Sequence, residues 1–323
     1  MRYRALGCTG LSVSEIGFGA WGIGGRTSGT TSYGDTDDRT SLAALARALD
    51  CGITFFDTSA AYGNGHSETL IGQAFAGRRD KVMIATKAGY DSWDRPPDFS
   101  ADAVAASVKK SLRRLCSDYI DLLQLHNPPA EALRDERLRG ALARLQADGK
   151  IRAWGVSAKS PAEAIEALAE FGAPVIQANF NMMDVRALES GLLAEAERRG
   201  AGFIGRTPLC FGFLSGTIAR GTVFPPGDHR LGWLQAQLDN WIEGAGDLLQ
   251  AVGAAPGTAG AQAALRFCLA FPAVSTVIPG ILKPEEADQN AAASTAGPLS
   301  AAAVDAVLAI NRRRQFFVAR PRG

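Results

Sequence analysis

The sequence predicts an α/β protein, a closed (β/α)8 barrel in which parallel strands alternate with surrounding helices. Short β-branched runs alternate eight times with amphipathic segments rich in Ala and Leu, which is typical of parallel α/β folds. The length of 323 residues suits one large barrel. No Pro/Ser-rich linker divides the chain, and its composition does not change between the two halves. We therefore expect one barrel domain over residues 1–323, with a long doubly wound sheet as the alternative that the alternation leaves open.

The strands are predicted from short apolar, β-branched runs that end in turn residues. They are Ile16–Gly19, Ile53–Asp57, Val82–Lys87, Ile120–His126, Ala153–Ser157, Val175–Ala178, Phe203–Arg206 and Val274–Ile278. The helices are predicted from apolar residues that recur on one helical face. They cover residues 37–50, 67–77, 101–116, 131–148, 161–171, 187–199, 258–270 and 284–293.

Several of these helices carry their own start and stop signals. Ser160 and Glu163 have the spacing of a capping box, in which each side chain binds a backbone N–H of the other residue. Ser100 precedes an amphipathic run and is a predicted N-cap. Gly149 and Gly200 follow helical runs and suit the left-handed conformation that ends many helices.

Three segments lie outside the alternation. The N-terminal residues, broken by a turn at 7–10, predict a β-hairpin before the barrel. Residues 207–257 form a long insertion after the seventh strand, with a predicted helix at 230–243. The segment 299–312 predicts an extra C-terminal helix.

Composition limits the possible partners. The formal net charge of +1 gives no reason to expect nucleic acid or an anionic membrane as a partner. The N-terminus is too polar and too rich in glycine for a signal peptide, and no apolar run approaches the ~20 residues that a membrane span needs. The three histidines lack the spacing of metal ligands, so we expect no metal.

The cysteines point to a reducing compartment. There are five, an odd number, without CxxC spacing, and most lie in or beside apolar runs: Cys8, Cys51, Cys116, Cys210 and Cys268. This pattern predicts buried free thiols. We therefore expect a cytoplasmic protein, and the sequence leaves its oligomeric state open.

Residues 17–22 match the GxGxxG pattern of dinucleotide-binding folds, and Asp37 and Asp38 follow about 20 residues later. That fingerprint requires a helix to begin within it, so that helix N–H groups meet the pyrophosphate. The residues that follow are rich in Gly, Ser and Thr and cannot form that helix. We therefore interpret them as a flexible loop above the first strand.

Ionisable residues end three consecutive predicted strands. Asp57, Lys87 and His126 are the last residues of the second, third and fourth strands, and Tyr62 lies in the loop after the second. The C-terminal ends of the strands meet at one mouth of such a barrel. These four side chains are therefore predicted to converge.

Together the four residues suit proton transfer to a carbonyl oxygen. A free tyrosine has a pKa of about 10, and a lysine ~4 Å away would favour the phenolate. We expect Lys87 to lower the pKa of Tyr62 by roughly one to three units. Asp57 would keep Lys87 charged and oriented, and His126 would hydrogen-bond the substrate oxygen. Such a set fits protonation of a carbonyl oxygen while hydride arrives at the carbon, or the reverse.

These residues resemble a known family. The segment FFDTSAAYG, residues 55–63, with Lys87 and His126, is similar to the catalytic motifs of the aldo-keto reductases. These are NAD(P)H-dependent carbonyl reductases built on a TIM barrel, and the resemblance extends from the N-terminal hairpin to Asn290. It implies that Tyr62 is the general acid, that Lys87 and Asp57 tune it, and that His126 orients the carbonyl.

The resemblance also implies a nicotinamide cofactor, with NADPH as the first choice and NADH or dual use left open. The implied contacts are Gly19, Trp21, Ser157, Gln177, Arg206, Pro208, Leu209, Gly212, Ser215, Lys283 and Asn290. Arg206 replaces the usual aromatic residue that stacks on the nicotinamide, a role that a planar guanidinium can fill. Residues 211–216 correspond to the strap over the pyrophosphate. Lys283 is the only base in 279–290 that could meet a 2′-phosphate.

The expected substrate is a small carbonyl compound, bound by Trp21, Tyr90, Trp93 and Asn127. The sequence does not choose among a simple aldehyde, a ketone and a sugar, nor does it give the physiological direction. Two alternatives stay open. One is a reductase-like subunit that binds nicotinamide to sense redox state with little turnover. The other is a cofactor-free isomerase or hydrolase that uses Asp57 and His126 as acid and base.

Overall fold

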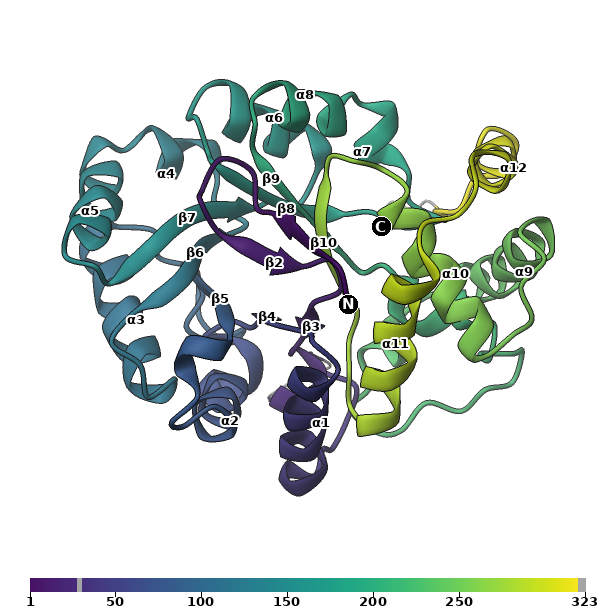
Figure 1. Ribbon diagram of the computed structural model, residues 1–323, viewed down its shortest axis with the longest axis horizontal. Helices are drawn as coiled ribbons and strands as arrows, with labels where there is room; N and C mark the ends of the chain where they lie inside the picture. Colours follow the sequence, from purple (N-terminus) through teal and green to yellow (C-terminus); the bar gives the residue numbers. More distant parts are fainter. Residues whose placement is uncertain (28–30, 319–323) are drawn as a thin grey trace.

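The computed structural model describes residues 1–27 and 31–318 and contains the predicted barrel (Figure 1). Eight parallel strands follow one another in sequence order: β3 (Phe18–Gly19), β4 (Phe55–Asp57), β5 (Met83–Ala88), β6 (Ile120–His126), β7 (Ile151–Ser157), β8 (Val175–Asn179), β9 (Gly202–Arg206) and β10 (Val274–Ile278). Parallel bridges between Ile16 and Val277 and between Gly19 and Gly280 join the first strand to the last. The sheet is therefore a nearly closed barrel, and the doubly wound alternative is excluded.

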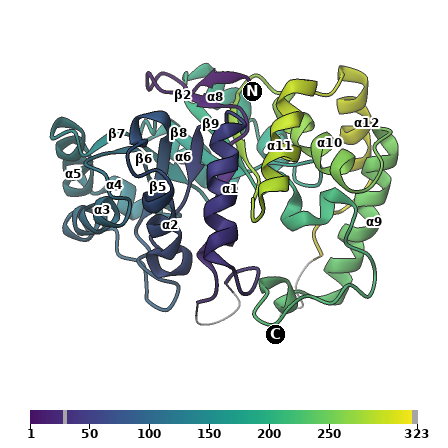
Figure 2. The same cartoon turned by 60° about the horizontal axis from the view of Figure 1, so that its bottom comes forward.

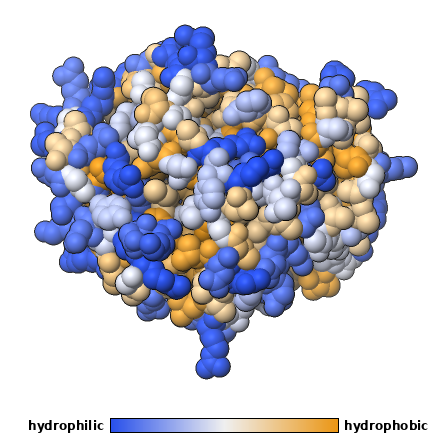
Figure 3. Space-filling model, viewed as in Figure 1, coloured by the Kyte–Doolittle hydropathy of each residue, from blue (hydrophilic) through white to orange (hydrophobic). Residues whose placement is uncertain are grey.

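The predicted hairpin closes one end of this barrel. Strands β1 (Tyr3–Ala5) and β2 (Ser12–Ser14) pair antiparallel and lie across the barrel mouth that faces the viewer in Figure 1. Leu6, Leu11 and Val13 pack against the apolar barrel interior, which includes Phe55 and Leu122. The outer surface of this face is mainly hydrophilic, with scattered apolar side chains (Figure 3). The loops at the C-terminal ends of the strands lie at the opposite end (Figure 2).

Helices surround the barrel and cover the outer face of the strands. They are α1 (Asp38–Asp50), α2 (His66–Ala74), α3 (Ala101–Arg114), α5 (Glu136–Ala147), α6 (Pro161–Ala169), α8 (Leu192–Arg198), α10 (Thr258–Leu269) and α11 (Pro284–Ala296). The predicted signals are present: Ser160 and Glu163 form a capping box, and the Ser100 side chain accepts from Ala103 N. Gly149 and Gly200 have φ of 65° and 66°, so both adopt the left-handed conformation that favours glycine.

Two predicted helices are each broken in two. The expected helix 131–148 consists of α4 (Ala130–Arg134) and α5, because Asp135 is extended and caps α5 by accepting from Arg137 N at 2.8 Å. The expected helix 187–199 consists of α7 (Arg186–Glu189) and α8, because Gly191 adopts φ 80° between them. In both cases a local capping residue interrupts the apolar periodicity.

The insertion and the tail differ from the prediction only in their bounds. The insertion helix, α9 (Gln235–Ala251), begins and ends later than the predicted 230–243. The tail forms α12 (Ala301–Asn311), which lies beside α9 (Figure 2). In the part of the chain that the structure describes, no single helix is long and apolar enough to cross a membrane. Only α11 and α12 taken together, bent by 115°, reach that length and composition.

The GxGxxG segment does not form a dinucleotide-binding turn. Strand β3 is followed by a short 3-10 turn at Gly22–Gly24, and the next helix begins only at Asp38. Asp37 caps that helix, with its carboxylate accepting from Thr40 N at 2.7 Å. The expectation of a loop here is confirmed for the described residues. Positions 28–30 of the loop lie outside them.

The expectation of buried thiols holds for two of the five cysteines. Cys210 and Cys268 are buried, whereas Cys8 and Cys116 are exposed and Cys51 is half-buried. All five are free thiols. The prediction was wrong for the other three because their neighbouring apolar residues face the core while the cysteines sit in turns or at helix ends.

Candidate active site

The barrel interior is layered, with apolar residues below and polar residues above. Successive strand residues point to opposite faces, so residues two apart share a face. The apolar interior includes Phe55, Ala85, Leu122, Val175 and Ile204. Two positions further along the same strands lie Asp57, Lys87, Gln124, Gln177 and Arg206. The alternation thus builds a polar layer directly beneath the C-terminal mouth of the barrel.

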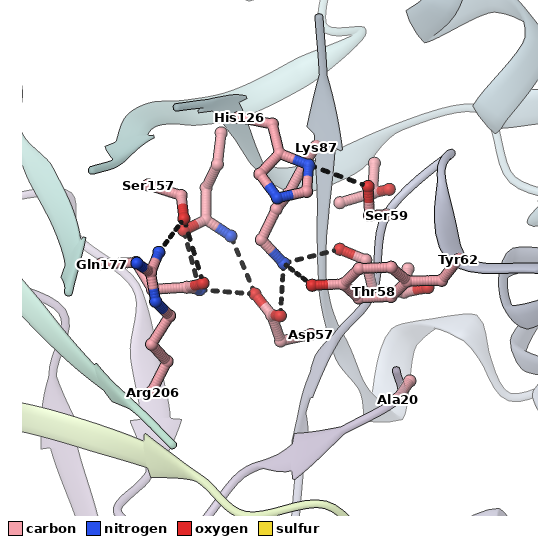
Figure 4. A network of polar contacts seen from close by, with 12 residues as sticks. Ala20, Asp57, Thr58, Ser59, Tyr62, Lys87, His126, Ser157, Gln177 and Arg206 are labelled. Atoms are coloured by element: carbon pink, nitrogen blue, oxygen red, sulfur yellow. Dashed lines mark hydrogen bonds and ion pairs between the residues drawn. The ribbon is translucent and has the colours of Figure 1, made fainter. Parts of the chain in front are cut away.

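Lys87 lies at the centre of this layer (Figure 4). Its Nζ donates to Asp57 Oδ1, to Thr58 O at 2.9 Å and to Tyr62 Oη at 3.3 Å. The Lys87 side chain is fully buried and that of Asp57 is 2% exposed. An ammonium group has three protons, so these three acceptors use all of them. The ammonium is therefore fixed beside the phenol oxygen, as the sequence predicted.

Two amides hold the second oxygen of Asp57. Gln124 Nε2 and Gln177 Nε2 each donate to Asp57 Oδ2 at 2.8 Å, and Gln177 Nε2 also lies 3.0 Å from Gln124 Oε1. Gln124 was not predicted from the sequence. The signal was present, because Gln124 precedes His126 by two residues on the same strand and so faces the same way.

The pKa of Tyr62 is raised overall: Lys87 acts in the predicted direction and lowers it, but the expected net lowering is wrong for this structure. Burial disfavours the phenolate more than the positive charge of Lys87 favours it, and Asp57 adds a further rise. Burial also opposes the charge of Lys87, but Asp57 and Tyr62 outweigh it and raise the pKa of the ammonium. At neutral pH the site therefore presents a neutral phenol next to a lysine cation.

His126 lies near the phenol as a neutral imidazole. Burial, with the charges of Lys87 and Arg206, lowers its pKa well below the ordinary value. Its Nδ1 lies 3.3 Å from Ser59 Oγ, and its ring meets that of Tyr62 edge-on at 6.2 Å between centroids. A neutral imidazole offers one N–H and one lone pair, which suits contact with a carbonyl oxygen.

The predicted substrate residues divide into two groups. Tyr90 and Trp93 pack on His126, with ring centroids 5.5 and 5.4 Å from that of the imidazole. Asn127 follows His126 in the chain and has φ 54°. Within residues 1–27 and 31–318, Trp93 Nε1 and Asn127 Oδ1 are buried without a hydrogen-bond partner. Trp21 lines the cavity described next, and the other three do not.

A cavity of about 640 Å³ extends from Asp57 and Tyr62 past the 3-10 turn Cys210–Ser215 to the start of α11. It is lined by nine of the predicted cofactor residues: Gly19, Trp21, Gln177, Arg206, Pro208, Leu209, Gly212, Ser215 and Asn290. Ser157 lies beneath this lining, where it accepts from Arg206 Nη1 at 2.8 Å. Lys283, the remaining one, is exposed and is not part of the lining.

Hydrogen bonds from all its nitrogens hold the Arg206 guanidinium. Nε donates to Asn179 Oδ1 at 2.7 Å, Nη1 to Ser157, and Nη2 to Ala158 O at 2.8 Å. The plane of the group is thereby fixed at the edge of the cavity, close to Gln177 (Figure 4). Asn179 was not predicted, although it follows Gln177 by two residues on the same strand.

The insertion contributes a further lining residue. Arg230 binds Asp228 through two hydrogen bonds of 2.9 and 2.6 Å and donates to Phe211 O at 3.1 Å. It therefore holds the 3-10 turn that borders the cavity. His229 N donates to Ser32 O at 2.9 Å, so the insertion also contacts the loop after β3. Arg230 was not predicted from the sequence, because no local pattern in this part of the insertion indicates which side chains turn inward.

Comparisons with known proteins agree with this fold. The model of the Aldo/keto reductase family matches residues 15–312. Aldo-keto reductase YhdN of Bacillus subtilis is 36% identical over 239 residues, which cover 71% of this chain and 69% of YhdN. A probable voltage-gated potassium channel subunit beta of Oryza sativa is 31% identical over 93% of both chains. The solved structure of the glycerol dehydrogenase AKR11B4 from Gluconobacter oxydans is 29% identical, with a TM-score of 0.79 over 99% of this chain and 98% of that one. With its barrel and this match over residues 15–312, the chain belongs to the aldo/keto reductase family of oxidoreductases.

Proposed function

We propose that the chain reduces an aldehyde or ketone to the alcohol, or catalyses the reverse, with a nicotinamide cofactor in the cavity beside Tyr62. The observation that carries this proposal is the contact between Tyr62 Oη and Lys87 Nζ at 3.3 Å, where the phenol lines the cavity and the lysine is buried. A reduced nicotinamide supplies hydride to the carbonyl carbon. The protein's own residues must then supply the proton.

Tyr62 is the proposed donor of that proton. Its raised pKa keeps the phenol protonated at neutral pH. When the proton leaves, Lys87 stabilises the phenolate across the 3.3 Å contact. Asp57 balances the charge of Lys87 in the barrel interior. The Lys87–Asp57 pair therefore keeps its charges and its hydrogen bond while Tyr62 gives up its proton. General acid catalysis of this kind contributes roughly 10²–10⁴ to a rate.

His126 and its neighbours are the proposed carbonyl site. The neutral imidazole can hydrogen-bond the carbonyl oxygen without competing for the Tyr62 proton, because burial lowers its pKa. Tyr90 and Trp93 form an aromatic wall on His126. The unpartnered Asn127 Oδ1 and Trp93 Nε1 could bind polar groups of a substrate. These features support a small, partly polar carbonyl compound.

The residues of the cavity fit a nicotinamide dinucleotide. Gln177 and Arg206 provide polar groups near Tyr62, and Asn290 does so at the far end. A Cβ at Gly280 would meet no atom within 4 Å, which leaves open space over the backbone there. NADPH was the first expectation from the sequence, and Lys283 was its only basic support. That lysine is exposed and outside the lining.

The similarity to a channel beta subunit favours a second candidate function, a redox-sensing subunit with little turnover. The two functions differ in multiple turnover. Purified chain, NADPH or NADH, and a panel of aldehydes and ketones should consume cofactor in excess of the protein, followed by loss of absorbance. Cofactor that raises the unfolding temperature but is not consumed would favour the sensor. If neither cofactor stabilises the fold, the cofactor-free isomerase or hydrolase would replace both.

We also propose that residues 1–323 form one domain and that the protein works in the cytoplasm. The core supports the first statement, because most of the buried hydrophobic residues between Ile16 and Phe316 form one hydrophobic cluster. Five free thiols support a reducing compartment.

A further inference from the structure

The end of the cavity that lies far from Tyr62 carries a negative charge. It is lined by the loop before α11 and by the first turns of that helix, including Gly280, Leu282, Glu286, Gln289 and Asn290. Among the residues of this loop and helix that line the cavity, Glu286 is the only ionisable one. A dinucleotide with its nicotinamide at Tyr62 would bring its adenosine half to this end.

The Glu286 carboxylate occupies the position where an anion would bind. Its Oε2 accepts from Leu282 N at 2.6 Å and from Lys283 N at 3.3 Å. Backbone N–H groups ahead of a helix are ordinarily a favourable site for a phosphate. Here both N–H groups already bind a carboxylate of the protein itself, and Pro284 has no N–H to add.

The described chain offers no free cation at this end of the cavity to offset that charge. Lys283 is exposed and does not line the cavity. The cations that do line it in the described residues are Arg206, bound to its strand partners, and Arg230, bound to Asp228. A 2′-phosphate placed here would meet a carboxylate instead of the basic groups that usually bind phosphate.

We propose that Glu286 makes this cavity select NADH over NADPH. A carboxylate accepts a hydrogen bond from a ribose 2′-hydroxyl, and it repels a 2′-phosphate. This inference rests on the proposed nicotinamide site. It replaces the sequence-based first choice of NADPH, because the sequence identified Lys283 as a base but could not show that Glu286 faces the cavity.

The test is a titration of the purified chain with NADH and with NADPH, followed by protein fluorescence and by the unfolding temperature. The wild type should bind NADH at least about tenfold more tightly than NADPH, since a carboxylate and a phosphate repel each other strongly in a partly buried site. In Glu286→Gln the amide oxygen can still accept from both N–H groups, and the preference should shrink by about tenfold. Glu286→Ala frees the two N–H groups and should shift the preference in the same direction.

Glu285→Gln is the matched control. Glu285 is the neighbouring residue in the same helical turn, is exposed and does not line the cavity, and its substitution changes the net charge equally. The ratio of its dissociation constants for NADH and NADPH should stay within about twofold of the wild-type ratio, because exposed charges are screened by salt. An NADPH preference in the wild type, or an unchanged ratio in both Glu286 variants while both cofactors bind, would overturn the role of Glu286 alone. Failure of the wild type to bind either cofactor would overturn the nicotinamide site itself and the inference with it.

Discussion

Replacement of Lys87 by methionine tests the buried ion pair. Methionine keeps most of the length of the side chain but removes the charge that Asp57 Oδ1 binds. Asp57, 2% exposed, would then hold a negative charge with only the amides of Gln124 and Gln177 as donors. We therefore expect Lys87→Met to destabilise the fold and to abolish turnover.

The size of the effect follows from the burial of the pair. Removal of one partner of a buried ion pair costs about 3–5 kcal/mol. The entropy of unfolding is about 2.1 cal/mol/K per residue. For 323 residues the midpoint temperature of thermal unfolding should therefore fall by roughly 4–7 °C. Thermal unfolding followed by circular dichroism measures this shift. Cofactor consumption measures the loss of activity.

The same substitution at an exposed pair provides the control. Lys110 donates to Asp91 at 2.6 Å, with the two side chains 48% and 43% exposed, so Lys110→Met should cost no more than about 1 kcal/mol. In the double variant Asp57→Asn/Lys87→Met no charge is left unpaired, and the asparagine oxygen can still accept from the two amides. It should regain most of the lost stability but no activity. Strictly additive losses from the two single substitutions would refute the reasoning.

Three further predictions concern the same layer. Because burial raises the pKa of Tyr62, the phenol keeps its proton as pH rises. The rate of reduction at saturating substrate should therefore be constant from about pH 6 to 9 and fall only above about pH 10. A fall in the rate centred near pH 8 would contradict this. Gln124→Leu removes one donor to Asp57 and should lower the free energy of unfolding by about 1–3 kcal/mol, measured by thermal unfolding. Gln146→Leu, at an exposed position, should leave that free energy nearly unchanged. Arg206→Lys cannot keep the three hydrogen bonds of the guanidinium, so cofactor titration should show binding weakened by about tenfold, and unchanged binding would remove Arg206 from the site.

Much of the site could be predicted because a parallel barrel converts sequence position into spatial position. Asp57 and His126 end their strands and Lys87 is the last residue but one of the strand between them, and strand ends meet at one mouth. Gln124 could have been predicted from the same alternation. Periodicity also located the helices but not the breaks at Asp135 and Gly191, where a single capping residue outweighs an otherwise continuous apolar face.

Other features depend on burial and orientation, which no sequence pattern gives. The direction of the Tyr62 pKa depends on a balance between desolvation and the charge of Lys87, and burial outweighs that charge. The neighbouring residues Lys283 and Glu286 have opposite charges, and only the structure shows which of them faces the cavity. The sequence therefore predicted the reaction class more securely than the cofactor.

The most direct test of Tyr62 as proton donor is the rate of carbonyl reduction by Tyr62→Phe at saturating cofactor. The variant keeps the ring and loses only the hydroxyl, so the rate should fall by roughly 10²–10⁴, while the dissociation constant of NADH changes by less than about twofold. Tyr33→Phe, the same change at another tyrosine that lines the cavity, should keep a rate close to that of the wild type. Reduction by Tyr62→Phe at the wild-type rate would contradict the proposed mechanism.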